Sequence, residues 1–142
     1  MKNHSLKSSA NKALKGLWMA FPMILGTTLV ISLISVIIPK TFYTTIFGKN
    51  NFLNSIIGSF IGSISAGNPI TSYIFGGEML KQGVRLVAVT AFLVSWVTVG
   101  IIQLPAESAI LGKRFAILRN LTSIILSIFV AIITVLLLGV MG

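Results

Sequence analysis

The sequence predicts an all-α membrane protein, a polytopic helix bundle with three full spans plus one broken or re-entrant helical segment. Of the 142 residues, 55% are hydrophobic and only 9% are charged. An ordinary soluble domain carries about 25% charged residues, so this chain has too little polar surface to keep a folded monomer in water. The order of the residues also favours a membrane protein, because long apolar runs alternate with short basic segments.

The charge distribution also favours a membrane. The net charge is +9, from 11 Lys and Arg against 2 Asp and Glu. The basic residues lie in four groups between the apolar runs: Lys2, Lys7, Lys12 and Lys15; Lys40 and Lys49; Lys81 and Arg85; Lys113, Arg114 and Arg119. This spacing is typical of charges that flank membrane spans and contact anionic lipid, not of a single nucleic-acid-binding patch. We therefore expect membrane lipid as a partner and no nucleic acid.

The elements follow in chain order. Residues 1–15 are a polar, basic N-terminal tail, either frayed or a short interfacial helix, and residues 16–142 are the membrane domain. The first span covers about 17–38, with Pro22 in its first turns, where a missing N–H costs little. The run is long enough to cross a bilayer and no small-x-small site follows it, so we expect a retained helix and not a cleaved signal peptide. Residues 41–51 form a connector.

The segment 52–80 is interrupted at Gly67-Asn68-Pro69, which separates two apolar pieces. Each piece is near the length of about 10–14 residues that is typical of re-entrant or core segments. It forms either one long broken span or a hairpin that enters and leaves on one side. A hairpin places seven basic residues on the side of the N-terminus and four on the other, whereas a broken span gives six against five. Because basic residues are retained in the cytoplasm, the hairpin is favoured, with the N-terminus inside. The alternative split of six against five would fit a protein that is inserted in both orientations.

Two further spans are expected at 86–104 and 121–140. Between them, Pro105 and Glu107 predict the start of a short helix, because proline suits the first helical position and an acid suits the first turn.

The interruption is the strongest functional candidate in the chain. A helix break in lipid frees backbone N–H and C=O groups, which cost several kcal/mol each unless they are paired. Such a break is retained where it lines a cavity or binds a ligand, with helix dipoles directed at it. The candidate pathway residues are Ser65, Gly67, Asn68, Pro69, Thr71 and Ser72. The alternative is a tight turn that Asn and Ser side chains cap.

Small residues recur at a spacing of four. Gly58, Gly62 and Ala66 form one row beside a row of Ser55, Ser59, Ser63 and Gly67, and a weaker row of Ser123, Ser127 and Ala131 follows. Such rows let helix backbones approach closely in lipid. We expect Gly58, Gly62 and Ala66 to pack helices, within one chain or between two.

A few polar residues could couple or gate a pathway. Glu78 is one of only two acids and could carry a proton, or it could simply pair with Lys81 or Arg85. Gln103 ends its span, where it could line a pathway or cap a neighbouring helix.

Glu107 and Arg114 are seven residues apart, which would place them on one helical face, with Lys113 and Arg119 nearby. They could form the salt bridge of a gate or a mouth that attracts anions. The alternative is helix capping and contact with lipid headgroups.

Several classes of site are excluded or not expected. The chain has no cysteine, and its single histidine, His4, lies in the polar tail. A thiolate or histidine metal centre and a catalytic triad inside the bundle are therefore excluded. We expect no metal, no cofactor and no enzymatic activity.

Two runs resemble a known family: GSISAGNPITSYIFGGEML (Gly62–Leu80) and VTAFLVSWVTVGIIQLPAESAILGKRFAILRN (Val89–Asn120). They are similar to predicted permeases related to the organoarsenical efflux permease ArsP and to YraQ, over about residues 52–140. The resemblance implies a multi-spanning permease of the cytoplasmic membrane, and a half-length member that pairs with itself. The chain has no thiol with which to bind a trivalent arsenical, so the resemblance implies the transport class and not that substrate.

The functional hypothesis is therefore a membrane permease or efflux subunit that moves a small solute near Gly67-Asn68-Pro69 as a homodimer or larger homo-oligomer. The nucleotide-binding motif GxxxxGK[ST] is absent from the sequence. Coupling would then use an ion gradient, a protonatable glutamate or a partner ATPase. The alternative is a non-transporting scaffold or accessory subunit of another membrane complex.

Overall fold

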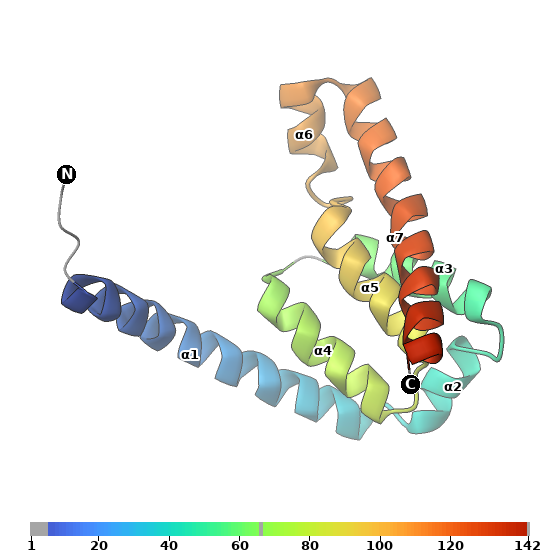
Figure 1. Ribbon diagram of the computed structural model, residues 1–142, viewed down its shortest axis with the longest axis horizontal. Coiled ribbons are helices and arrows are strands. Elements are labelled where there is room, and N and C mark those ends of the chain that lie inside the picture. The colour runs from blue at the N-terminus through green and yellow to red at the C-terminus, as the bar shows by residue number, and fades with distance from the viewer. Residues whose placement is uncertain (1–5, 66, 142) are drawn as a thin grey trace.

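A computed structural model describes residues 6–65 and 67–141. This part of the chain is entirely helical apart from its connections, which confirms the all-α prediction. Its seven helices are α1 (Leu6–Ile37), α2 (Lys40–Ile46), α3 (Asn51–Ile64), α4 (Pro69–Lys81), α5 (Leu86–Thr98), α6 (Leu104–Leu111) and α7 (Lys113–Met141). Helices α3, α4 and α5 form the centre, α1 extends away from them, and α7 runs back past α5 (Figure 1).

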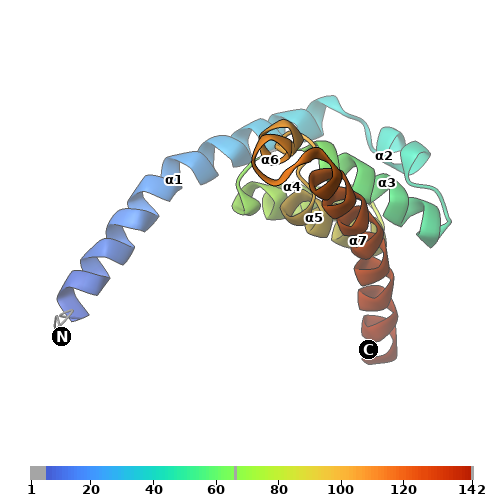
Figure 2. The same ribbon diagram turned by 90° about the horizontal axis from the view of Figure 1, so that it is seen from above.

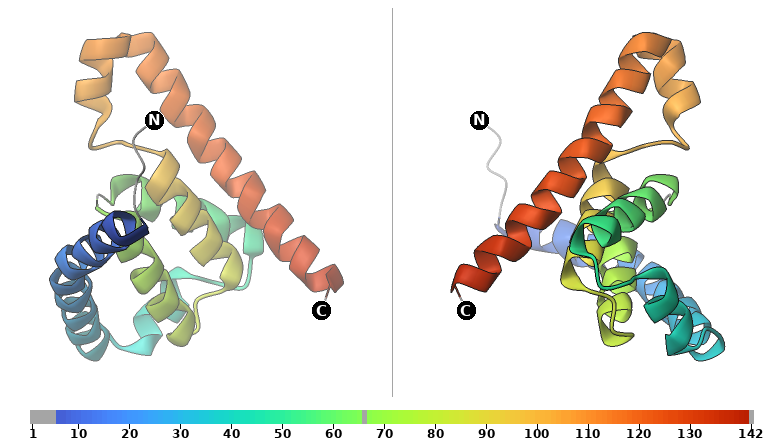
Figure 3. Two further views of the ribbon diagram at one scale, coloured as in Figure 1. Left: turned by 60° about the vertical axis from the view of Figure 1, so that its left-hand side comes forward. Right: turned by 90° about the vertical axis from the view of Figure 1, so that its right-hand side faces the viewer.

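Two helices, α1 and α7, are long and apolar enough to cross a membrane. They contain 32 and 29 residues, more than the roughly 20 that a bilayer requires. Only 6% of the most apolar stretch of α1 and 11% of that of α7 are buried. The apolar side chains of both helices are therefore mainly exposed. Figures 1 and 3 show that much of α1 and part of α7 extend away from the other helices.

Helix α1 starts earlier than predicted. It begins at Leu6, so most of the predicted tail is helical. The expectation that Pro22 lies in the first turns is wrong, because it lies in the middle of the helix. An interior proline removes one backbone hydrogen bond and crowds the preceding turn, which bends a helix. Figure 2 shows α1 as a curved helix. Helix α2 occupies part of the predicted connector.

The segment 52–80 folds back on itself. Arg85, which follows α4, donates a hydrogen bond of 2.7 Å from Nη1 to Oδ1 of Asn51, the first residue of α3. The two ends of the segment therefore meet, and α3 and α4 form a hairpin. Their 14 and 13 residues correspond to about 20 Å each at 1.5 Å per residue, which is shorter than a hydrocarbon core of about 30 Å.

The prediction of one uninterrupted helix over 86–104 is wrong, because the helix in this region is shorter. Helix α5 ends at Thr98, and the chain is irregular until α6 begins at Leu104. Gly100 weakens the helix at this point, and its N–H donates to the side chain of Asn120 instead of to a preceding carbonyl. The short helix predicted at Pro105 and Glu107 is present as α6. Helix α7 begins at Lys113, eight residues before the predicted 121.

Glycines bring α3 and α5 into backbone contact. A Cβ on Gly58 would lie 2.2 Å from the carbonyl oxygen of Ala88, and one on Gly62 would lie 2.4 Å from that of Phe92. The predicted row of small residues therefore lies at a helix–helix contact, while its third member, Ala66, is outside the described residues. The second contact lies four residues further along both helices than the first, so α3 and α5 run parallel.

Serine hydroxyls join α7 to this pair. Ser59 and Ser127 are buried, and their Oγ atoms are 2.7 Å apart. The hydroxyl of Ser127 also donates to the carbonyl of Ile124 at 2.7 Å, so Ser59 is the donor between the two serines. Ser95 of α5 donates to the backbone oxygen of Ser59 at 2.6 Å. Three helices thus share one buried polar contact, which we call the serine seam (Ser59, Ser95 and Ser127).

Candidate functional site

Two helix breaks lie next to each other in the folded chain. The first separates α3 from α4 and the second separates α5 from α6. Because α3 and α5 run parallel, their C-terminal ends are neighbours. Residues from both breaks line one open pocket of about 130 Å³, which we call the break pocket. Its lining includes Ser65, Gly67 and Pro69 from the first break, Val99, Gly100 and Gln103 from the second, Trp96 from α5 and Arg119 from α7.

The first break is capped by its own residues. Asn68 Oδ1 accepts a hydrogen bond of 2.9 Å from the N–H of Ile70, and Pro69 begins α4. Both are common features of a helix start. On the other side, Ser65 Oγ donates to the carbonyl of Ile61 at 2.8 Å. The turn interpretation therefore describes the local structure correctly.

Trp96 holds the first break against α5. Its Nε1 donates a hydrogen bond of 3.4 Å to the carbonyl oxygen of Gly67. A Cβ on Gly67 would lie 3.1 Å from the indole ring, so the residue's small size lets the chain approach. The indole thus forms a wall of the break pocket and also satisfies a backbone group freed by the break.

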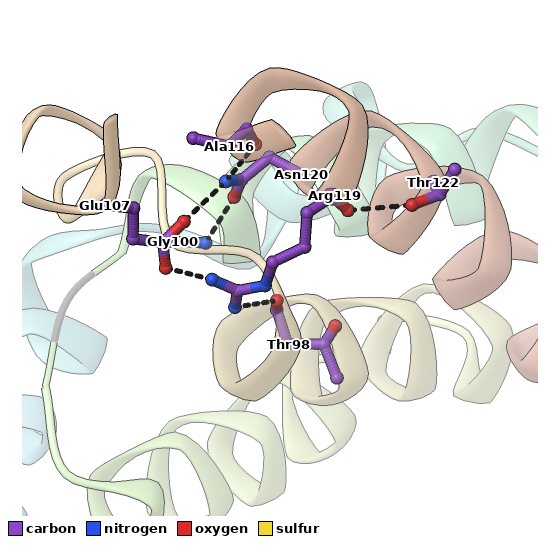
Figure 4. Close-up of polar contacts among 7 residues, drawn as sticks. All are labelled: Thr98, Gly100, Glu107, Ala116, Arg119, Asn120 and Thr122. Atoms are coloured by element: carbon purple, nitrogen blue, oxygen red, sulfur yellow. Dashed lines mark hydrogen bonds and ion pairs between the residues drawn. The ribbon is translucent and has the colours of Figure 1, made fainter. Parts of the chain in front are cut away.

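The second break is held by α7, as Figure 4 shows. Gly100 donates its N–H to Asn120 Oδ1 at 2.8 Å, which orients the amide so that Nδ2 donates to Glu107 Oε2 at 3.1 Å. Arg119 Nη1 forms an ion pair with Glu107 Oε1, and Nη2 donates to the carbonyl of Thr98 at 3.3 Å. The end of α5, the loop and α6 are therefore tied to one turn of α7.

The expected shared face of Glu107 and Arg114 does not exist. Gly112 has a φ of +88° and separates α6 from α7, so helical spacing does not extend across it. Arg114 is exposed on the first turn of α7, and Glu107 pairs with Arg119 instead. Gly112 could have indicated in the sequence that a helix ends between Glu107 and Arg114, because glycine often ends a helix. Asn120 was missed, since one buried asparagine has no distinctive pattern.

The six candidate pathway residues lie in three different places. Ser65, Gly67 and Pro69 line the break pocket. Asn68 and Thr71 instead line a small pocket against α1. Ser72 is buried, and its hydroxyl donates to the carbonyl of Pro69 at 2.7 Å.

The remaining candidates, Gln103 and Glu78, lie in different parts of the structure. Gln103 lines the break pocket with Arg119. Glu78 lies in a groove between α1 and α4, where it pairs with Lys81 at 3.4 Å and accepts a hydrogen bond of 3.1 Å from Gln82. Within the described residues, no group of three or more His, Asp or Glu side chains could hold a metal ion.

Comparison with models of protein families gives no match, and comparisons with curated proteins and with solved structures give none either.

Proposed function

We propose that this chain is a subunit of a membrane permease that moves a small solute across the cytoplasmic membrane. The observation that carries the proposal is the meeting of two helix breaks at one pocket beside Arg119. Backbone breaks at membrane depth are tolerated where they are buried in protein or line a cavity. Transporters place their substrate sites at such discontinuous helices.

The arrangement of helices suggests how the chain crosses the bilayer. In this proposal α1 and α7 are full spans, and α3–α4 is a re-entrant hairpin. Helix α6 continues beyond the end of α5 and lies beside the first turns of α7 (Figures 1 and 3). The pair α5–α6 then crosses as one broken helix, in place of the second full span that the sequence predicted at 86–104.

The basic residues support an orientation. The ends of the hairpin lie together, with Lys49, Lys81 and Arg85 near them. The turn between α6 and α7 carries Lys113 and Arg114 and is separated from those ends by the α5–α6 crossing. Because the side with more basic residues is retained in the cytoplasm, the N-terminus and the α6–α7 turn would face inward.

Self-association is part of the proposal. Three crossings and one hairpin are few for enclosing a path, and the resemblance to the permeases related to ArsP and YraQ implies that a half-length member pairs with itself. The N-terminal half of α1 supports a partner or lipid contact, since Leu17, Trp18 and Phe21 are each 60% exposed or more.

Solute flux into liposomes that contain only this protein tests the proposal. Ser65→Phe would fill the break pocket, so flux should fall by about tenfold or more. Thr28→Ala is the matched control, because Thr28 faces the groove between α1 and α4 and its hydroxyl bonds only to its own helix. Equal flux by both variants would overturn the placement of the path. A folded protein that moves no solute from a broad panel would instead favour the scaffold.

A further inference from the structure

We infer that the break pocket binds a small anion that carries a carboxylate or similar oxyanion group, and that Glu107 is a tethered anion competing for the same cation. This inference rests on the proposed function, because it names the solute class of that pocket. Its three supports are the geometry around Glu107, the exposure of Arg119 and the weak attachment of α6.

The first support is a carboxylate clamp that is already built. One oxygen of Glu107 pairs with Arg119, and the other accepts from Asn120 Nδ2 at 3.1 Å. Asn120 is 4% exposed, and Gly100 fixes the orientation of its amide. A guanidinium and an amide N–H that converge on one carboxylate are groups that bind oxyanions strongly. The bound carboxylate of Glu107 thus indicates that this site accepts a carboxylate or a similar oxyanion.

The second support is that Arg119 also faces the break pocket. Its side chain is 38% exposed, and it is part of the pocket's lining. A guanidinium has five N–H donors, and the contacts with Glu107 and Thr98 account for two of them. The chain has only two acids, and neither is among the pocket's lining residues as the structure describes them. Among the described lining residues the charged side chain is therefore that of Arg119, and Glu107 balances its charge until a solute anion displaces that carboxylate.

The third support is the attachment of α6, which carries Glu107. All eight residues of α6 are at least partly exposed, and Ile110 is 81% exposed. The helix packs mainly against α7, and Gly112 joins the two with a positive φ. The Glu107 side chain is 14% exposed, but none of the residues of α6 is fully buried, so little apolar burial would be lost if the helix moved away from Arg119. A solute anion can therefore exchange with the tethered carboxylate at a modest cost.

The pocket has room for a small anion. Its volume of about 130 Å³ is enough for acetate or inorganic phosphate, which are therefore the probes used below.

Two measurements test the inference. In the first, acetate and phosphate are titrated into detergent-solubilised protein while the fluorescence of Trp96 is recorded. Trp96 lines the pocket, and the other tryptophan, Trp18, is removed as Trp18→Phe. In the second, uptake of acetate, phosphate, glycerol and urea into liposomes is compared. The variants are Arg119→Gln, Arg119→Lys, Glu107→Gln and the control Arg114→Gln, whose arginine is exposed on the same helix.

We expect a saturable Trp96 response to at least one anion, lost in Arg119→Gln, weakened in Arg119→Lys and unchanged in Arg114→Gln. Glu107→Gln removes the competitor, so the half-saturating anion concentration should fall by about threefold to tenfold. An unchanged or higher value in this variant would overturn the role of Glu107.

The outcomes separate this inference from the proposed function. Uptake of glycerol or urea without a saturable response to either anion would overturn the anion class and leave transport intact. A saturable response that Arg119→Gln abolishes, without flux of any solute, would support the anion site and overturn transport. A response that persists in a folded Arg119→Gln variant would overturn the assignment of the cation.

Discussion

Arg85 Nη1 donates a hydrogen bond of 2.7 Å to Asn51 Oδ1, although 34 residues separate the two along the chain. Asn51 begins α3 and Arg85 follows α4, so this contact closes the hairpin at its base. The hairpin tip then reaches the break between α5 and α6, where the break pocket forms. The contact between Arg85 and Asn51 therefore lies at one end of the hairpin, and the two helix breaks meet at its other end.

The hairpin predicts that Lys49 and Lys81 lie on the same side of the membrane. The chain has no native cysteine, so single cysteines at these positions can be labelled without background. In right-side-out vesicles, an impermeant maleimide should label Lys49→Cys and Lys81→Cys equally. Lys113→Cys should react only after permeabilisation, because the α5–α6 crossing lies between. Labelling of Lys49→Cys and Lys81→Cys from opposite sides would contradict the hairpin.

The backbone contact between α3 and α5 predicts a strong response to a single methyl group. Gly58→Ala should lower the free energy of unfolding by about 1–3 kcal/mol, because the new Cβ would overlap the carbonyl of Ala88. Gly77→Ala in α4 is the control, since its Cβ meets nothing within 4 Å. This control should be neutral or more stable by about 0.5–1 kcal/mol. Unfolding in mixed detergent micelles measures both, and equal effects would be inconsistent with the close packing.

The serine seam predicts energetic coupling between α3 and α7. A double-mutant cycle of Ser59→Ala and Ser127→Ala should give a coupling of about 0.6 kcal/mol, and at most about 1.7, as expected for hydrogen bonds within membranes. Thr134 supplies the control for α7, because its hydroxyl bonds to the carbonyl of Val130 on its own helix. A cycle of Ser59→Ala with Thr134→Ala should be additive. Additivity in the first cycle would mean that the two hydroxyls do not interact.

The ion pair at the second break predicts which arginine couples to Glu107. A cycle of Glu107→Gln with Arg119→Gln should show a coupling of about 1 kcal/mol in the free energy of unfolding, since both side chains are partly exposed. The same cycle with Arg114→Gln should show none, because Arg114 is exposed on the first turn of α7. The seven-residue spacing in the sequence would require the reverse result, so the two cycles decide between the pairs.

Pattern and composition were enough for several features. The helical class, the long apolar helices α1 and α7 and the break at Gly67-Asn68-Pro69 all depend on residues close together along the chain. The start of α6 next to Pro105 could be predicted for the same reason, because a helix start is coded within a few residues. The end of α5 could not be predicted in this way. It depends on Asn120, which lies 20 residues further along the chain and accepts a hydrogen bond from the N–H of Gly100.

By itself, then, the sequence determined that the chain is helical and largely apolar, where one helix is interrupted, and which glycines are small enough for a backbone contact. Only the tertiary structure decided that the interrupted segment returns to its starting end, that the two breaks share a pocket, and that Glu107 takes Arg119 as its partner. The physical reason is that these features depend on contacts between distant segments. Local hydrogen bonding and hydrophobic periodicity do not encode such contacts.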